Sequence, residues 1–241
     1  MSVSILLMQS VKRLVPRTVT RLIPQGVKDF FGPLTARLKV IGYDAVFVQV
    51  GAHHADDEVR RLALRRRWRG LLIEPLPHIF AKLESNYSGV KRFHCINSAV
   101  SDQSGTDMPF YFLPDATIEA LELPWWSDQV GSFDRAQVAK HFPAHISPHI
   151  RSVLVPVDTL SNILIKNNIT RLDVLQIDAE GYDYRILSQL DFNQWLPRIL
   201  IFEHSNLSDE DLATADSLLR GKGYALSRLG YDTIAELKVG S

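Results

Sequence analysis

Residues 46–52 read Val-Phe-Val-Gln-Val-Gly-Ala, a short apolar run that ends at Gly51. A buried strand that ends in glycine and opens a helix lets the backbone approach a bound ligand closely. Asp56 and Asp57 stand where they can cap that helix, which we expect to run to about Trp68. The stretch therefore predicts a strand, a ligand-binding loop and a helix, in that order.

Strand and helix patterns alternate through the rest of the chain. Further strands are expected at residues 71–74, 93–100, 173–177 and 199–203. Helices are expected at residues 77–87, 159–167, 182–190 and 208–221, and a closing hairpin at 224–228 and 233–237. This alternation predicts an α/β, Rossmann-like fold with a mostly parallel sheet, helices on both faces and a C-terminal antiparallel hairpin. Ligands bind such sheets beyond the carboxyl ends of the strands.

The bulk composition fits one large domain with a buried core. The chain has 241 residues, 46% of them hydrophobic and 22% charged, and its net charge is zero. Because basic residues are not in excess, we expect no nucleic-acid partner. Cys95 is the single cysteine, so no intramolecular disulfide can form. The composition leaves the oligomeric state open.

We expect a cytoplasmic protein. No apolar run reaches the roughly 20 residues that a membrane-spanning helix needs. The apolar residues 1–8 have no basic residue before them, and Lys12 and Arg13 follow, which is the reverse of a signal peptide.

Residues 1–40 differ from the domain expected at residues 41–241. They carry seven lysines and arginines against one acid, Asp29. Three prolines should divide them into pieces too short for one helix: Pro16, Pro24 and Pro33. Two interpretations stay open, an arm or lid packed on the domain and a segment that contacts an anionic membrane surface.

Residues 109–150 interrupt the strand–helix alternation with five prolines, three histidines and the pair Trp125-Trp126. An insert of this length inside a compact domain is usually functional, so we expect it to form much of a substrate pocket. The tryptophans could stack on a sugar or close that pocket. Simple packing of the two rings is the alternative.

An acid at the end of the second strand completes the first candidate site. Glu74 follows Gly51 by 23 residues, where a carboxylate can accept hydrogen bonds from ribose hydroxyls. Folds for dinucleotides and for adenosyl donors share this arrangement. A pyrophosphate needs further glycines, whereas Gly51 is followed by Ala-His-His-Ala at 52–55, which disfavours a nicotinamide cofactor. The alternative is a glycine that merely ends a strand and a solvated glutamate.

A second cluster follows the fourth expected strand. Residues 176–184 read Gln-Ile-Asp-Ala-Glu-Gly-Tyr-Asp-Tyr. Asp178 and Glu180 point the same way if the chain stays extended, and they could position a hydroxyl, accept its proton or hold a divalent metal. Capping of the helix that begins near Tyr182 is the alternative. His204, beside Glu203 at the end of the fifth strand, is a further candidate general base.

Six arginines between residues 60 and 69 look at first like a nucleic-acid patch. Val59, Leu62 and Ala63 give the same helix an apolar inner face, which leaves the arginines mainly outside. A solvated helix face is therefore the favoured interpretation.

Taken together, these motifs resemble the FkbM-type family of S-adenosylmethionine-dependent methyltransferases. The resemblance runs from about Phe47 to Glu236. Its segments are Val-Gln-Val-Gly-Ala (48–52), Trp-Arg-Gly-Leu-Leu-Ile-Glu-Pro (68–75), Ala-Val-Ser-Asp (99–102), Gly-Ser-Phe (131–133), Leu-Gln-Ile-Asp-Ala-Glu-Gly-Tyr-Asp (175–183) and Phe-Glu-His (202–204).

The resemblance implies a class I methyltransferase fold that uses S-adenosyl-L-methionine to methylate a hydroxyl oxygen of a small molecule or glycan. It implies a donor site of Gln49, Gly51, Ala52, His53, Glu74, Ala99, Ser101 and Asp102. It places Asp178, Glu180 and His204 near the acceptor as the catalytic residues. A divalent metal is possible but not expected.

The donor loop departs from the family pattern Gly-Ala-Asn-x-Gly. His53 stands in place of the asparagine and Ala55 in place of the second glycine. These changes motivate an alternative function, that of a catalytically degenerate relative which serves as a binding or partner module.

Overall fold

The computed structural model describes residues 25–54, 57–105 and 107–238. Its main sheet has seven strands in the order β11-β12-β10-β9-β1-β2-β3. Their bounds are β1 Val46–Val50, β2 Arg69–Glu74, β3 Phe93–Asn97, β9 Val174–Ile177, β10 Ile199–Glu203, β11 Tyr224–Leu229 and β12 Asp232–Leu237. The helices beside it are α2 Gln25–Leu38, α3 Glu58–Arg65, α4 Pro77–Tyr87, α7 Leu160–Lys166, α8 Asp183–Ser188 and α9 Asp209–Gly221.

Strand β1 lies at the centre of a parallel array. It pairs in parallel with β2 on one side and with β9 on the other, and β10 continues the array beyond β9. Strand β12 runs antiparallel to β10 and forms a hairpin with β11. The predicted parallel sheet and its antiparallel C-terminal hairpin are both confirmed.

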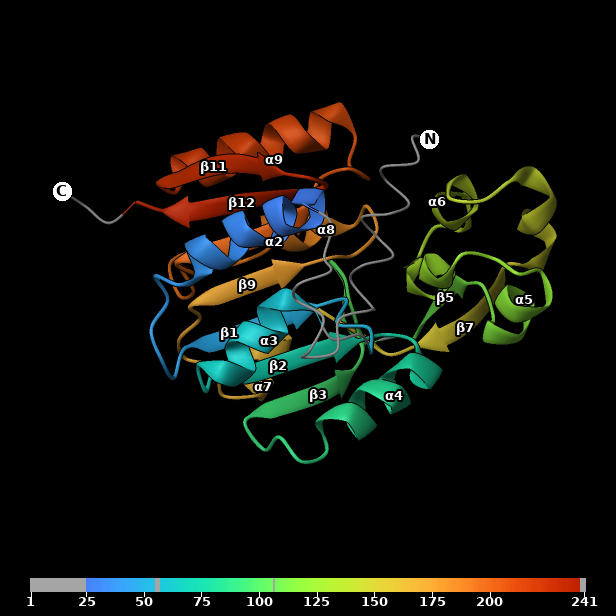
Figure 1. Ribbon diagram of the computed structural model, residues 1–241, viewed down its shortest axis with the longest axis horizontal. Coiled ribbons are helices and arrows are strands. Elements are labelled where there is room, and N and C mark those ends of the chain that lie inside the picture. The colour runs from blue at the N-terminus through green and yellow to red at the C-terminus, as the bar shows by residue number, and fades with distance from the viewer. Residues whose placement is uncertain (1–24, 55–56, 106, 239–241) are drawn as a thin grey trace.

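Alternating side chains of the central strands fill two hydrophobic layers. Val48 and Val50 face the cluster formed with α7, α8 and α9. Phe47 faces the opposite cluster, formed with α2, α3 and α4. Because side chains of a strand alternate between its faces, a strand that is buried throughout, as β1 is, must be covered on both faces, as Figure 1 shows. Each such buried side chain stabilises the fold by about 1.5–3 kcal/mol.

Helix α3 begins where the sequence predicts. Asp57 is its N-cap, and its carboxylate accepts a hydrogen bond from the Arg60 amide at 2.8 Å. Asp56 lies outside the described residues.

Pro33 does not end a helix, contrary to the prediction. Helix α2 runs through it from Gln25 to Leu38. Proline removes one backbone hydrogen bond, but burial of Leu34 and Leu38 in the same cluster as α3 keeps the helix on the domain. The remainder of the predicted arm or membrane-contacting segment, residues 1–24, lies outside the described residues. No helix among residues that the structure describes has the length and apolar character needed to cross a bilayer.

The strand predicted at residues 93–100 is two strands. Strand β3 ends at Asn97, and Ala99–Val100 forms β4, which pairs with β8 (Val157–Asp158) in a separate small sheet. The Ser98 hydroxyl donates to the carbonyls of Ala99 and Pro156, each at 3.1 Å. The chain therefore pairs with β2 before Ser98 and with β8 after it. The pattern of apolar residues alone does not reveal this change.

The insert has its own secondary structure. Strand β5 (Met108–Phe112) pairs antiparallel with β6 (Gly131–Ser132) and with β7 (Arg151–Val155). The intervening helices are α5 Asp115–Ala120, η1 Trp125–Gln129, α6 Arg135–Lys140 and η2 Ala144–His149. Figure 1 shows this unit beyond the carboxyl ends of the parallel strands, where it can cover a ligand site.

Candidate functional site

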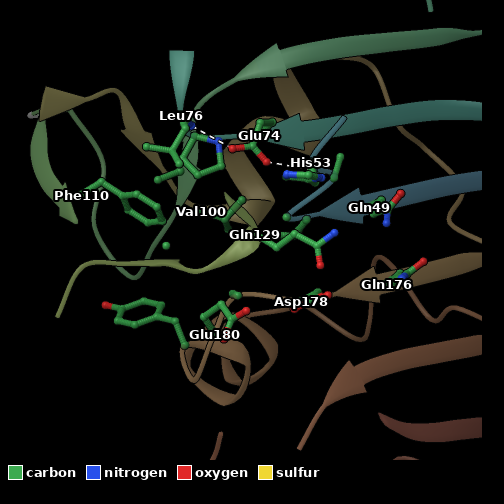
Figure 2. Close-up of a pocket in the computed structure, with 18 of the residues that line it drawn as sticks. Gln49, His53, Glu74, Leu76, Val100, Phe110, Gln129, Gln176, Asp178 and Glu180 are labelled. Atoms are coloured by element: carbon green, nitrogen blue, oxygen red, sulfur yellow. Dashed lines mark hydrogen bonds between the residues drawn. The ribbon is translucent and has the colours of Figure 1, made fainter. Parts of the chain in front are cut away.

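A pocket lies between the carboxyl ends of the parallel strands and the insert (Figure 2). The loops after β1, β2 and β9 line one part of it, and β5, η1 and β6 line another. The space between the lining side chains amounts to about 1140 Å³, part of it open to solvent. In Figure 2, Glu74 and His53 lie on one side of the pocket, and Asp178 and Glu180 lie on the other.

Gly51 allows the loop after β1 to lie directly against the loop after β9. Its φ is +72°, and a β-carbon on it would lie 1.8 Å from the carbonyl oxygen of Asp178. The Asp178 amide donates to the Val50 carbonyl at 3.1 Å, and the Ala52 amide donates to the Ile73 carbonyl at 2.9 Å. These backbone hydrogen bonds continue the strand pairing into the loops and hold them close together. Because the loops are so close and φ is positive, only glycine fits at position 51.

Glu74 holds the loops after β1 and β2 in place. One carboxylate oxygen accepts from the His53 amide and the other from the Leu76 amide, both at 2.9 Å. Burial raises the pKa of Glu74 to about 7, although both hydrogen bonds and the Arg60 charge favour ionisation. Each oxygen keeps a second lone pair, so the carboxylate can also accept a hydrogen bond from a hydroxyl group of a ligand.

His53 replaces the family asparagine without an evident backbone penalty. Its φ is +48°, in the left-handed region where asparagine and histidine are both enriched. Ala55, the other departure from the family pattern, lies outside the described residues.

Gln49, Asp57 and Arg60 form a hydrogen-bonded group in the pocket lining, in which Gln49 and Arg60 are buried and Asp57 is partly exposed. Gln49 Nε2 donates to Asp57 Oδ2 at 2.9 Å, and Arg60 Nε donates to the same oxygen at 2.8 Å. Burial alone would raise the pKa of Asp57, but the Arg60 charge and the hydrogen bonds outweigh it and hold the pKa below its usual value. Arg60 is 1% exposed and lines the pocket, so the prediction that the helix arginines are solvated is wrong for this residue. The capping carboxylate that pairs with it permits its burial.

Asp178 and Glu180 both line the opposite part of the pocket. The chain between them is not extended, because Glu180 has a φ of +50°. Even so, carboxylate oxygens of Asp178, Glu180 and Glu203 lie within 4.8 Å of one another. The Asn206 amide donates to Glu180 at 2.8 Å and to Glu203 at 2.9 Å. This cluster can accept a proton, and it is also the arrangement that a metal-assisted reaction would need.

Asp183 holds the loop that carries these acids. Its carboxylate is fully buried and accepts from the amides of Ala179, Gly181 and Glu203 at 3.2–3.4 Å. Neither Asp178 nor Glu180 caps α8, whose N-cap is Tyr182 with no side-chain hydrogen bond. Burial, and then the Glu203 charge, raise the pKa of Asp183 to about 8.

Asp183→Asn should weaken the dependence of stability on pH. Between the ordinary pKa of 3.8 and about 8, the folded wild-type chain retains a proton on Asp183 that the unfolded chain releases. Its free energy of unfolding should therefore fall as pH rises through this range. Urea denaturation at pH 5 and pH 8 should show a drop that is smaller by a few kcal/mol in the variant. Equal drops in both proteins would contradict the assignment.

Two residues assigned to the donor site lie just outside the pocket lining. Ala99 lines the pocket, but Ser101 and Asp102 do not. The Ser101 amide donates to the Asp158 carbonyl at 3.0 Å, and Asp102 accepts the Tyr182 hydroxyl at 2.9 Å. The pairing of β4 with β8 holds Ser101 outside the lining, whereas Ala99 and its neighbour Val100 line the pocket.

His204 is also absent from the lining of this pocket. Its backbone amide donates to the Tyr231 carbonyl at 2.8 Å, which ties it to the turn of the β11–β12 hairpin. Burial, and then the Arg228 charge, lower the pKa of His204. The chain after β10 turns toward the hairpin, so the structure does not bring His204 into the pocket with Asp178.

The insert supplies apolar and aromatic walls that sequence reasoning did not assign residue by residue. Phe133 packs edge-on against Tyr182 with ring centroids 5.3 Å apart, and against Phe110 at 5.2 Å. Trp125 lines the pocket, whereas Trp126 stacks on Phe142 inside the insert. Trp125 thus lies where it could close the pocket, whereas Trp126 follows the alternative of simple packing.

The structure brings eight of the eleven predicted site residues into one pocket. They are Gln49, Gly51, Ala52, His53, Glu74, Ala99, Asp178 and Glu180. Sequence reasoning missed the pocket-lining Asp57, Arg60, Asp128 and Gln129. The capping position of Asp57 was a usable signal, but no local pattern marks Asp128 or Gln129.

Comparisons with known proteins identify the family. Residues 49–226 match the family described as Methyltransferase FkbM domain. The chain is 29% identical over 166 residues to Methyltransferase 1 of Beauveria bassiana (strain ARSEF 2860), a match that spans 65% of this chain and 63% of that protein.

Solved methyltransferases resemble the fold at low sequence identity. Precorrin-6y C5,15-methyltransferase from Geobacter metallireducens is 10% identical, with 95% of each chain covered and a TM-score of 0.47. The N-terminal domain of human METTL16 in complex with SAH is 12% identical, with 95% of this chain and 74% of that chain covered and a TM-score of 0.41. With its α/β sheet, its pocket and a match over residues 49–226, the chain belongs to the FkbM methyltransferase family.

Proposed function

We propose that the chain transfers a methyl group from S-adenosyl-L-methionine to a hydroxyl oxygen of a small molecule or glycan. One observation carries the proposal: the glycine loop after β1 and the acids after β9 line a single pocket, with Gly51 against the backbone of Asp178. A donor on the first loop would therefore lie beside carboxylates that can handle a proton.

The donor half of the pocket fits an adenosyl group. Glu74 stands at the end of β2 with lone pairs for ribose hydroxyls. Leu76, Ala99 and Val100 provide apolar surface nearby for a flat base. Gly51 and Ala52 line the pocket, and the amino-acid portion of the donor would lie against this loop.

The acceptor half combines carboxylates with aromatic rings. Asp178 and Glu180 line the same pocket as the aromatic residues Phe133, Tyr182 and Trp125. Carboxylates bind hydroxyl groups, and aromatic faces pack against the apolar faces of sugars and polyketide rings. This pairing favours a hydroxylated acceptor with a flat or cyclic apolar face.

The chemistry asks little of the protein beyond alignment and proton removal. When bound, the donor supplies an electrophilic methyl carbon on a sulfonium. Asp178 accepts the hydroxyl proton as the acceptor oxygen bonds to that carbon and the carbon–sulfur bond breaks. Glu180, held by Asn206, orients the hydroxyl. Alignment of the two reactants supplies several kcal/mol of the barrier reduction.

Glu74→Gln should weaken donor binding by roughly 10–100-fold, because hydrogen bonds to a charged acceptor contribute about 1.5–3 kcal/mol. The ionised carboxylate is the better acceptor and its pKa is about 7, so wild-type affinity should rise between pH 6 and pH 8. Calorimetry with S-adenosylmethionine at both pH values measures this change. The exposed Glu84→Gln is the matched control. An unchanged affinity and pH profile in Glu74→Gln would remove Glu74 from the donor site.

The reaction itself is tested with methyl-labelled S-adenosylmethionine and panels of hydroxylated sugars, polyketides and related metabolites. We expect the label in an alkali-stable methyl ether, with one molecule of S-adenosylhomocysteine formed for each methyl group transferred. Label on nitrogen or carbon would contradict oxygen transfer. Donor binding without transfer to any acceptor would favour the alternative of a degenerate binding module.

A further inference from the structure

We propose that His53, His54 and Asp128 form a binding site for a divalent transition metal ion such as Zn²⁺. The three residues offer two imidazole nitrogens and a carboxylate oxygen, and these atoms all lie within 4.8 Å of one another. Two imidazoles and one carboxylate are a common ligand set for zinc when a fourth position is left open.

Two of the three separations between the ligand atoms are close to those of a tetrahedral zinc site. Asp128 Oδ2 lies 3.6 Å from Nε2 of His53 and 3.5 Å from Nε2 of His54. Both distances exceed the 2.7–3.2 Å of an ordinary N–H···O hydrogen bond. Ligands placed about 2.0–2.1 Å from a zinc ion at the corners of a tetrahedron are separated by about 3.4 Å. These two separations are therefore close to those between zinc ligands, and the third, between the two imidazole nitrogens, is at most 4.8 Å.

The backbone explains how neighbouring histidines can act together. Side chains of consecutive residues in an extended chain point to opposite sides. The positive φ of His53 turns the chain instead, and the two imidazole rings lie with centroids 4.1 Å apart and planes 32° apart. Histidine at the position of the family asparagine thus creates a pair of ligands on one side of the loop.

The ligands are held before any metal binds. The His53 amide donates to Glu74, and the His54 carbonyl accepts from Asn86 of α4 at 3.0 Å. The three side chains are 12–18% exposed. A site that is partly buried and anchored at both histidines needs little reorganisation on binding.

The site would join two parts of the fold. His53 and His54 follow β1, whereas Asp128 belongs to η1 of the insert. A bound ion would tie the insert to the donor loop. Because His53 and Asp128 also line the pocket, the open coordination position would face it and take a water or an oxygen atom of a bound molecule.

The test is titration of the chelator-treated full chain with Co²⁺, followed by displacement with Zn²⁺. We expect one Co²⁺ per chain with the visible absorption of a four-coordinate site. His54→Ala and Asp128→Asn, which alter different elements, should each weaken binding by roughly 100-fold or more, since loss of even a supporting residue costs 10–100-fold. His145→Ala, an exposed histidine of the insert, should leave the affinity unchanged.

Absence of saturable binding to the wild-type chain would overturn the proposal, as would equal affinity in the two ligand variants. X-ray absorption of the zinc-loaded wild-type chain gives a second readout that needs no variant. We expect two imidazole ligands there, and a shell of oxygen ligands alone would overturn the assignment. Neither measurement uses a methyl donor or acceptor, so both are independent of the proposed transfer reaction.

Discussion

Asp178→Asn is expected to slow methyl transfer by roughly 10²–10⁴-fold, the usual contribution of a general base. The amide cannot accept the hydroxyl proton, yet it has nearly the shape of the carboxylate and leaves the Asp178 backbone against Gly51 unchanged. Donor affinity should therefore stay within a few-fold of wild type. Single-turnover transfer from labelled donor, with calorimetry in parallel, separates the two quantities.

Two further variants sharpen this result. His204→Ala should retain transfer within a few-fold, because His204 does not line the pocket. Asp209→Asn replaces an exposed acid in the first turn of α9 and is the matched control. Full single-turnover activity of Asp178→Asn would show that another group takes the proton, and a large loss in His204→Ala would name that group.

Gly51→Ala should have the second large effect, on both stability and donor binding. The added methyl group would lie 1.8 Å from the Asp178 carbonyl oxygen, and alanine would be strained at a φ of +72°. Backbone strain and overpacking each cost about 1–3 kcal/mol, so we expect a loss of about 3 kcal/mol or more. In a chain of this size that corresponds to a fall in Tm of roughly 6–12 °C.

Thermal unfolding and donor calorimetry of the variant provide the measurement. Gly89→Ala is the control, since a β-carbon at Gly89 would meet nothing within 4 Å. A Gly51→Ala protein with wild-type Tm and donor affinity would mean that the loops after β1 and β9 do not approach each other as described.

The sequence predicts the scaffold of the site because strand ends carry local signals. Gly51 and Glu74 each end an apolar run, and parallel strands bring such ends to one edge of the sheet. The loop at Asp178 and Glu180 follows from the same rule. These residues lie in the pocket although no single motif places them there.

The remaining features depend on contacts between distant segments. Arg60 looks like its solvated neighbours in the arginine run until Asp57 is seen to pair with it. Asp128 reaches the histidine pair only because η1 folds over the donor loop. His204 follows a strand end as Asp178 does, but its backbone bond to Tyr231 turns it toward the hairpin. No periodicity in the sequence encodes these three placements.

Calorimetric titration of the full chain with S-adenosyl-L-methionine and with S-adenosylhomocysteine tests the central claim most directly. The pocket formed by the loops after β1, β2 and β9 should bind one donor per chain in the micromolar range, and Glu74→Gln should weaken that binding. No binding heat with either compound at millimolar concentration would contradict a donor site at Gly51 and Glu74 and would favour the degenerate binding module.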